Sequence, residues 1–214
     1  GPAISALSQG AYQSSIWLNT GEGGLSPFHR QAPCDLVFQI GTAKYGVRDE
    51  QGRLDAVKLT ELAAIPEIKM FEIKLSQGAK PGKGGILPGE KVTEVIASTR
   101  GIPAGQDSIS PNRHPEVTSV ESLLDLIKTV RDVSQKPTGI KFVLGQTQWL
   151  DDFCAAIHTR GIDSAPDFIT LDSADGGTGA APQGLMDNMG LPVAASLPLV
   201  DATLRQAGLR DRIR

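Results

Sequence analysis

Short apolar runs alternate along this chain with segments of helical periodicity, and this alternation constrains the fold more than any other feature. An apolar run of about four to eight residues between turn signals is typical of a strand buried on both faces of a parallel sheet. Six runs of this kind predict strands over residues 3–6, 15–18, 36–40, 70–75, 139–144 and 167–171. Strands separated by helices indicate an α/β fold, which we expect to form one domain over residues 1–214.

Helices are predicted between the later strands, where apolar residues recur at helical spacing. The clearest one has a capping-box pattern, in which Thr118 and Glu121 precede an apolar face that runs to Val130. The other expected helices contain Val57 to Ile65 before Pro66, Val92 to Ile96 before Gly101, Trp149 to Ile157 before Gly161, and a final stretch over residues 196–208.

Two architectures are compatible with this order, a doubly wound sheet and a (β/α)8 barrel of TIM type. Many of the 24 glycines lie in loops that directly follow the predicted strands. Barrel enzymes have their active sites at that end of the strands, so the barrel is favoured. About six βα units give a truncated barrel with two open edges, and we expect a homo-oligomer or completion by another chain to cover them.

Charge and composition exclude several classes of protein. The net charge of −3 argues against nucleic acid as a main partner and gives no polybasic membrane signal. No apolar stretch approaches the roughly 20 residues that cross a bilayer, and no signal peptide opens the sequence, so we expect a cytoplasmic protein and no membrane partner. Cys34 and Cys154 are too few for a disulfide framework or a metal–sulfur cluster.

Glycine-rich segments follow the predicted strands and carry functional side chains. In residues 19–24 three glycines allow a ligand to approach the backbone, although a tight turn is the favoured interpretation of that segment taken alone. Residues 172–182 precede a helix, and their backbone amides could bind an anion or support a flat ring. This last segment lacks the lysine of a Walker motif and the spacing of the dinucleotide fingerprint.

Charged residues within apolar strands are the strongest local sign of a site. Glu72 and Lys74 alternate on one strand and therefore point to the same face, where a barrel interior would make charges costly unless they are functional. Lys80 follows in a glycine-rich loop, and Lys141 lies inside another apolar strand. Such lysines suit a phosphate, a carboxylate or a polarised cofactor ring, and could stabilise developing negative charge. The alternative is a solvated charge cluster.

The histidines do not form a recognisable catalytic or metal motif. Residues 107–114 contain serines and His114, but no GxSxG elbow surrounds either serine, so we interpret the segment as a polar loop. His158 is expected on the solvated face of a helix. No spacing of histidine, cysteine and carboxylate indicates zinc.

Four segments together resemble the FMN-binding synthase domain of glutamate synthase, and especially its small stand-alone relatives. They are NTGEGGLSPFHRQ at 19–31, EIKLSQGAKPGKGGILPGEKV at 72–92, ISPNRH at 109–114 and DSADGGTGAAP at 172–182. Their order is that of the family, and the likeness extends over most of the chain.

The resemblance implies an FMN-dependent (β/α)8 barrel that makes L-glutamate from 2-oxoglutarate and ammonia or glutamine-derived nitrogen. A hydride from reduced FMN would reduce 2-iminoglutarate, the protein supplying orientation and charge. Lys74 and Lys141 would then be catalytic, and Glu22 and Lys80 would bind substrate. The residues facing the flavin would be Ser5, Asn19, Lys74, Gln77, Lys141, Gly176, Gly177 and Thr178.

The chain departs from the family in three places. Ile86 stands where the large enzymes have glutamine, and the cysteine-rich segment of those enzymes is missing, so we expect no iron–sulfur cluster and a separate electron-donor protein. The sequence has no segments that match barrel strands seven and eight of the family, and those strands would carry the FMN phosphate site. An alternative is therefore a catalytically silent barrel fragment or scaffold, which retains dicarboxylate binding and assembles through its open sheet edges.

Overall fold

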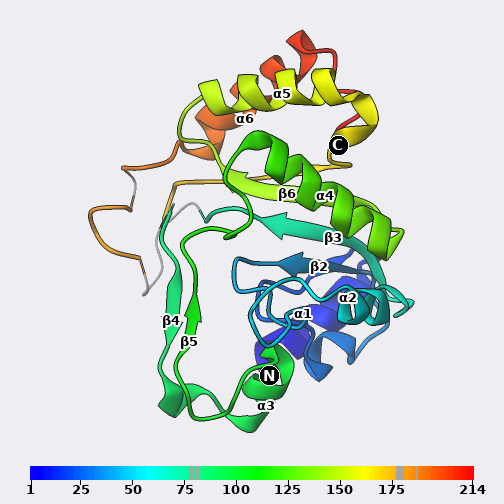
Figure 1. The fold of residues 1–214 in the computed structure, drawn as a ribbon. Helices are drawn as coiled ribbons and strands as arrows, with labels where there is room; N and C mark the ends of the chain where they lie inside the picture. Colours follow the sequence, from blue (N-terminus) through cyan, green and yellow to red (C-terminus); the bar gives the residue numbers. More distant parts are fainter. Residues whose placement is uncertain (78–79, 81, 177–180, 187) are drawn as a thin grey trace.

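The computed structural model shows a curled, five-stranded parallel sheet, the architecture of a partial barrel (Figure 1). It describes residues 1–77, 80, 82–176, 181–186 and 188–214. Every neighbouring pair of strands in the sheet is parallel. In spatial order the strands are β1 (Leu18–Asn19), β2 (Leu36–Ile40), β3 (Ile68–Lys74), β6 (Thr138–Val143) and β7 (Ile169–Asp172). The predicted α/β class is confirmed.

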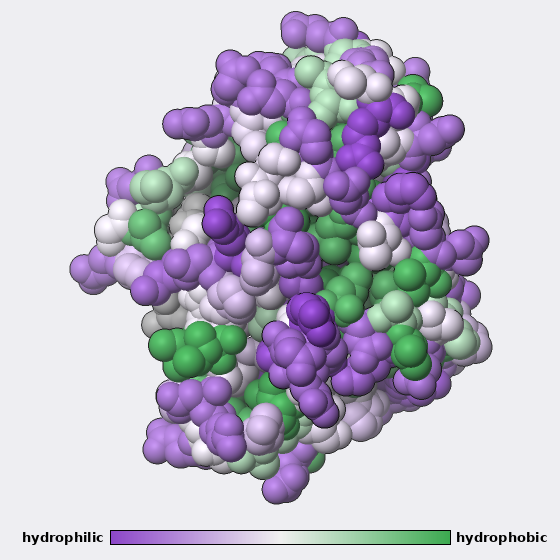
Figure 2. Space-filling model, viewed as in Figure 1, coloured by the Kyte–Doolittle hydropathy of each residue, from purple (hydrophilic) through white to green (hydrophobic). Residues whose placement is uncertain are grey.

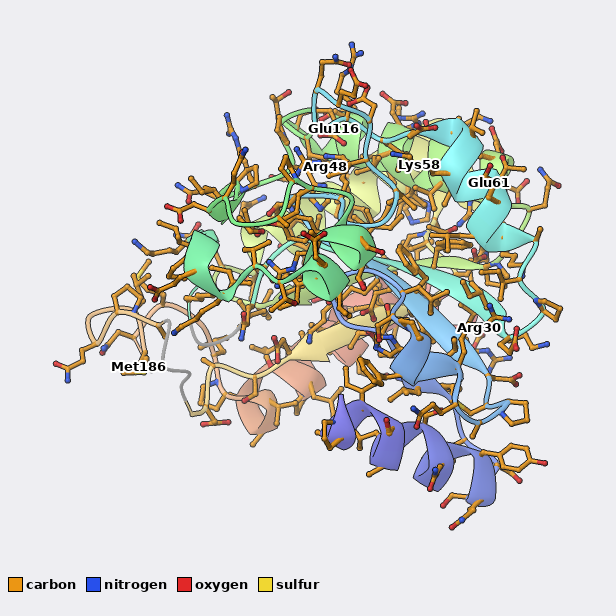
Figure 3. All side chains as sticks on the ribbon, turned by 90° about the horizontal axis from the view of Figure 1, so that it is seen from below. Arg30, Arg48, Lys58, Glu61, Glu116 and Met186 are labelled. Carbon is orange, nitrogen blue, oxygen red and sulfur yellow. The ribbon has the colours of Figure 1, made fainter. Side chains whose placement is uncertain are left out.

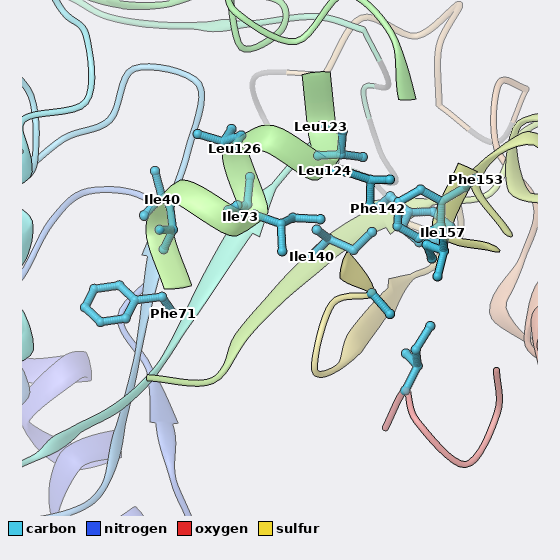
Figure 4. Packing of buried hydrophobic residues seen from close by; sticks show 14 of the residues in the cluster. Ile40, Phe71, Ile73, Leu123, Leu124, Leu126, Ile140, Phe142, Phe153 and Ile157 are labelled. Atoms are coloured by element: carbon cyan, nitrogen blue, oxygen red, sulfur yellow. The ribbon is translucent and has the colours of Figure 1, made fainter. Parts of the chain in front are cut away.

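Helices cover the outer face of the sheet. The helix α4 packs on β3 and β6, while α6 packs on β7. Leu123 and Leu124 of α4 are buried with Ile73 and Ile140 of the strands (Figure 4). These helices are α2 (Ala56–Ala63), α4 (Val120–Ser134), α5 (Gln148–Arg160) and α6 (Val193–Gln206). Burial of this apolar layer stabilises the sheet and leaves its other face concave and free of helices.

The predicted strand over residues 3–6 is wrong. Those residues lie in α1 (Pro2–Gln13), which Pro2 begins and in which Ser8 and Ala11 are the buried side chains. Proline is well tolerated at the first helical position, and an apolar run of four residues cannot by itself distinguish a strand from a helix. The strand predicted over 15–18 is also shifted, because Ser15 has a φ of 53° and pairing begins only at Leu18. The sheet in the described part of the chain therefore has five strands rather than six.

An antiparallel hairpin that the sequence did not predict stands apart from the sheet. It pairs β4 (Gly85–Leu87) with β5 (Ser108–Ser110). Ile86 opposes Ile109, and these side chains are 67% and 60% exposed. Figure 2 shows a hydrophobic patch on the side of the molecule where the hairpin lies. Part of the predicted polar loop over 107–114 is thus a strand.

The helix ends follow ordinary capping rules. The helix α3 (Glu94–Arg100) lies between the hairpin strands in the sequence and ends at Gly101, as predicted; the φ of Gly101 is 69°, which is left-handed. The capping box of α4 is formed by Ser119 and Ser122 rather than by Thr118 and Glu121, one residue further along the chain. Single turns of 3-10 helix occupy η1 (Pro27–Arg30), η2 (Gly89–Lys91) and η3 (Ile162–Ser164). None of the helices in the described ranges combines the length and hydropathy needed to cross a membrane.

Candidate functional site

The concave face of the sheet carries a layer of polar side chains. Each strand contributes one: Asn19 from β1, Gln39 from β2, Glu72 from β3, Lys141 from β6 and Thr170 from β7. They line a concavity of about 1020 Å³, whose remaining wall is largely apolar and includes Val37, Met70 and Phe168. An apolar cavity with a few convergent polar groups is the usual form of a cofactor site.

Glu72 is the centre of the polar layer. Its side chain is buried, with 2% exposure. Asn19 Nδ2 and Gln39 Nε2 donate to its Oε1 at 2.9 and 2.6 Å, and the hydroxyl of Thr170 donates to Oε2. No lysine, arginine or histidine in the described part of the chain forms an ion pair with this carboxylate. Three hydrogen bonds therefore compensate the burial of the charge.

The two lysines in strands are neighbours. Lys74 and Lys141 are in register on β3 and β6. Lys74 Nζ donates to Glu22 Oε2 at 3.0 Å, and Lys141 Nζ lies 3.5 Å from Asp172 Oδ2. Since an ammonium has three donors, each lysine keeps capacity for a bound anion after pairing with its carboxylate. The arrangement places two positively charged side chains on neighbouring strands, and Lys141 lines the concavity.

A second, smaller hollow lies beside the concavity, and we call it the lysine cleft. It has a volume of about 30 Å³, and the residues that matter for its charge and polarity are Glu22, Lys74, Gln77, Lys80, Lys83 and Asn112. Lys80 Nζ donates to the carbonyl of Gly84 at 3.4 Å, and the backbone amide of Gly84 donates to Asn112 Oδ1 at 2.9 Å. Three ammonium groups against one carboxylate make the cleft suitable for an anion carrying more than one negative charge.

The structure brings most of the predicted site residues together, in two groups. Asn19 and Lys141 line the concavity, whereas Lys74, Gln77, Glu22 and Lys80 line the lysine cleft. Glu72 and Lys74 lie on the same face of β3, as expected from alternation.

The remaining predicted residues lie elsewhere or outside the described residues. Ser5 lies on α1, where its hydroxyl donates to the carbonyl of Gly1 at 3.2 Å, so its expected place on a barrel strand is wrong. Gly176 follows β7 in a loop and has a φ of 81°. Gly177 and Thr178 are outside the described residues.

Two residues of the polar layer were not identified from the sequence. Gln39 is the single polar residue of an otherwise apolar strand, a signal of the same kind as Lys141. Thr170 gives no such signal, because threonine is common in strands. Both are found only because the sheet curls enough to bring β2, β3 and β7 to one carboxylate.

His114 is buried rather than part of a solvated polar loop. It is 1% exposed, and its Nε2 donates to the carbonyl of Lys74 at 3.0 Å, which fixes the loop before α4 to the end of β3. Burial, with Lys44 nearby, lowers the pKa of His114 to about 4. Lys44 itself is 1% exposed and pairs with Glu116 at 3.0 Å; Glu116 is labelled in Figure 3. His158 is exposed, as expected.

The described residues show no metal centre. Within those ranges, no three histidine, cysteine, aspartate or glutamate side chains cluster closely enough to hold a metal ion. Cys34 and Cys154 are both free and buried.

Comparison with known proteins identifies the family of this fold and site. The family model described as the conserved region in glutamate synthase matches residues 2–214. The chain belongs to the glutamate synthase family. Three of the four segments that suggested this resemblance contribute residues to the lining of the concavity or the lysine cleft, and the fourth begins at Asp172, which pairs with Lys141 of the concavity.

Curated members of the glutamate synthase family match nearly the whole chain. The glutamate synthase large subunit-like protein YerD of Bacillus subtilis is 42% identical over 213 residues, which are 99% of this chain and 40% of that protein. The archaeal-type glutamate synthase [NADPH] of Thermotoga maritima is 37% identical over 97% of this chain and 38% of its own length. The archaeal glutamate synthase [NADPH] of Archaeoglobus fulgidus is 36% identical over 98% and 38%. The chain therefore spans about two fifths of the length of these relatives.

Proposed function

We propose that this chain forms the FMN-binding and substrate-binding part of an oxidoreductase of glutamate biosynthesis. The reaction is the reduction of 2-iminoglutarate, formed from 2-oxoglutarate and ammonia, to L-glutamate. The observation that carries the proposal is that neighbouring residues line the ring-sized concavity and the lysine cleft. Gly21 of the concavity directly precedes Glu22 of the cleft, and Lys141 of the concavity is in register with Lys74 of the cleft. A bound ring and a bound dicarboxylate would lie side by side there.

The chemistry of the concavity fits an isoalloxazine ring. Its apolar wall suits the ring faces, while the ammonium of Lys141, the amide of Gln39 and the hydroxyl of Thr170 offer polar contacts to the ring edge. FMN, when bound, supplies the hydride. Lys141 would stabilise negative charge at the ring edge, because its own partner Asp172 is 3.5 Å away and leaves donors free.

The charge of the lysine cleft suits a dicarboxylate such as 2-oxoglutarate, which would lie over the cleft because a volume of about 30 Å³ holds only about one water molecule. Lys80 and Lys83 offer two ammonium groups that are in no ion pair with described residues, and Lys74 is fixed by Glu22. Two carboxylates of the substrate would pair with these cations, and Lys74 would hold a proton at Nζ near the imine nitrogen. Fixing the substrate at both ends restricts it to one orientation against the ring.

Further strands would complete the barrel next to β7. The amide of Arg214 donates to the carbonyl of Asp167 at 3.1 Å, and the amide of Ile169 donates to the carbonyl of Arg214 at 2.9 Å. This is the bonding pattern of a parallel strand. We propose that strands continuing from this pairing, or provided by another chain, close a (β/α)8 barrel and supply the phosphate site of FMN.

The electron source and the nitrogen source are also proposals. Two of the relatives are named as NADPH enzymes, so we propose NADPH as the ultimate donor, acting through an electron-donor protein. Nitrogen would arrive as ammonia, either free or released from glutamine by a separate protein.

Titration of the purified full chain with FMN and 2-oxoglutarate tests the proposal. We expect quenching of flavin fluorescence on FMN binding, weakened about tenfold by Lys141→Met, and a calorimetric signal for 2-oxoglutarate, weakened about tenfold by Lys80→Met. Lys128→Met is the matched control, because Lys128 is exposed on α4 and pairs only with Asp132 among the described residues. Absence of FMN binding to the wild type would count against the proposal.

A second function is favoured by one observation. The described residues that line the lysine cleft lie between Glu22 and Asn112, whereas the concavity extends to β7, the last strand of the sheet in the described part of the chain. A catalytically silent scaffold would therefore keep dicarboxylate binding and assemble through its free strand edges. Binding of 2-oxoglutarate without any binding of FMN, by a protein that scatters light as an oligomer, is the result that this alternative predicts.

A further inference from the structure

One buried carboxylate joins four strands of the sheet. Glu72 on β3 accepts hydrogen bonds from β1, β2 and β7. The bond from Thr170 crosses β6, whose residue in register with Glu72 is Gly139. On the same strand Lys141 is in register with Thr170, so the bond passes diagonally across β6. Side chains from three strands thus donate hydrogen bonds to the one carboxylate of Glu72.

Glu72 determines the orientation of the Asn19 amide. An ionised carboxylate only accepts hydrogen bonds, so Asn19 must turn its Nδ2 toward Glu72, at 2.9 Å. The opposite atom, Asn19 Oδ1, then accepts from the backbone amide of Gly21 at 2.8 Å. This is an Asx turn, in which the side-chain oxygen of an asparagine accepts a hydrogen bond from the backbone amide two residues further along the chain. Rotation of the amide by 180° would break both bonds.

The Asx turn in turn places Glu22. Gly21 has a φ of 68°, and the chain reverses there before Glu22. Glu22 fits against Gly41 at the end of β2, where a methyl group would lie 2.7 Å from the Glu22 Cβ. In this position Glu22 Oε2 accepts from Lys74 Nζ at 3.0 Å. A continuous series of contacts therefore runs from Glu72 to the lysine cleft.

We propose that Glu72 is a positioning residue of this site: its carboxylate fixes the amide of Asn19, and through the turn that Asn19 closes it places Glu22 against Lys74. Glu72 acts through Asn19 and does not itself line the lysine cleft. The relevance of the placement to dicarboxylate binding rests on the proposed function. The placement itself can be measured in the ligand-free protein.

An exchange of donor and acceptor tests this proposal in the full chain at pH 8. Glu72→Gln places an amide opposite the Asn19 amide, and Asn19→Asp places a carboxylate opposite the Glu72 carboxylate. Each single variant therefore loses the pairing of an amide donor with a carboxylate acceptor. In the double variant the new amide at position 72 can donate to the new carboxylate at position 19, whose other oxygen still accepts from Gly21. Gln39, which donates to the same Glu72 oxygen in the wild type, would turn its own amide oxygen toward that new nitrogen. Asp132→Asn is the control, because Asp132 is exposed and pairs with Lys128 on the outer face.

Hydrogen exchange of the Gly21 amide, followed by NMR, is the first measurement. We expect the single variants to lower its protection about tenfold or more, and the double variant to return it to within about threefold of wild type. Calorimetry with 2-oxoglutarate is the second measurement. We expect the affinity to be lower in each single variant than in wild type and to be restored in the double variant. Near-ultraviolet circular dichroism confirms that each variant is folded.

The outcomes separate the two claims. If Glu72→Gln leaves Gly21 protection at the wild-type level, or the folded double variant fails to restore it, the positioning role is refuted. If the wild type binds neither FMN nor 2-oxoglutarate while Gly21 protection follows the expected order, the positioning role holds and the proposed function fails.

Discussion

Replacement of His114 should remove a specific part of the acid sensitivity of this protein. In the folded chain the pKa of His114 is lowered to about 4, first because the ring is buried and second because Lys44 lies nearby; Glu116 and Glu22 oppose the shift. The ordinary value is 6.5. Since folding lowers the pKa, the unfolded chain binds the proton more tightly. The contribution of the neutral His114 ring to the free energy of unfolding is therefore complete above pH 6.5 and is lost as the pH falls toward 4.

The size of the effect follows from the two pKa values. A difference of about 2.5 corresponds to about 3 kcal/mol at roughly 1.36 kcal/mol per pKa unit. At pH 5 protonation of the unfolded chain has already removed about 2 kcal/mol of this amount relative to pH 7.5. That is a large part of the stability of a typical domain, about 5–15 kcal/mol.

Urea unfolding of wild type and His114→Gln at pH 7.5, 6 and 5 measures the effect. Glutamine keeps a donor for the carbonyl of Lys74 but does not titrate, so the stability of the variant should fall about 2 kcal/mol less than that of wild type between pH 7.5 and 5. His158→Gln is the comparison variant, because His158 is exposed and its Nε2 also donates to a backbone carbonyl, that of Ala207, at 2.8 Å. Parallel curves for wild type and His114→Gln would refute the reasoning.

Three further predictions concern packing, an ion-pair centre and the thiols. Gly139→Ala should lower the free energy of unfolding by about 1–3 kcal/mol, because its methyl group would lie 2.4 Å from the ring of Phe168; urea denaturation measures this. Asp167→Ala should cost about 2 kcal/mol in the same assay, since Asp167 accepts from two arginines and a backbone amide, and an unchanged midpoint would contradict this. Ellman's reagent at pH 8 should react with no thiol in the folded protein and with two in urea, because Cys34 and Cys154 are buried and burial raises the pKa of Cys154 to about 11.

The central strands and the outer helices could be predicted from the sequence because their signals are local. The apolar runs over 36–40, 70–75, 139–144 and 167–171 all fall on strands of the sheet, with ends shifted by one or two residues. The helix ending at Gly101 is equally clear, because a left-handed φ there needs glycine. In these segments the pattern of burial and the intrinsic preference of the residues agree.

The wrong predictions concern segments whose local signals were ambiguous or misleading. The run over 3–6 is apolar but short, and Pro2 with Ser8 and Ala11 makes it a helix. The hairpin of β4 and β5 joins residues more than 20 positions apart, with α3 between them, so no local pattern announces it. His114 lies in a polar segment, yet packing against the end of β3 buries it.

By itself, the sequence determined the fold class, the family and the residue types of the site, because periodicity, glycine-rich loops and charges inside apolar strands are properties of neighbouring residues. Tertiary structure alone decided which of those residues meet. Asn19, Gln39 and Thr170 come from three strands, and they share the carboxylate of Glu72 only because the parallel strands are in register and the sheet curls. Hydrogen bonds across strands depend on spatial neighbours, and a linear pattern does not contain them.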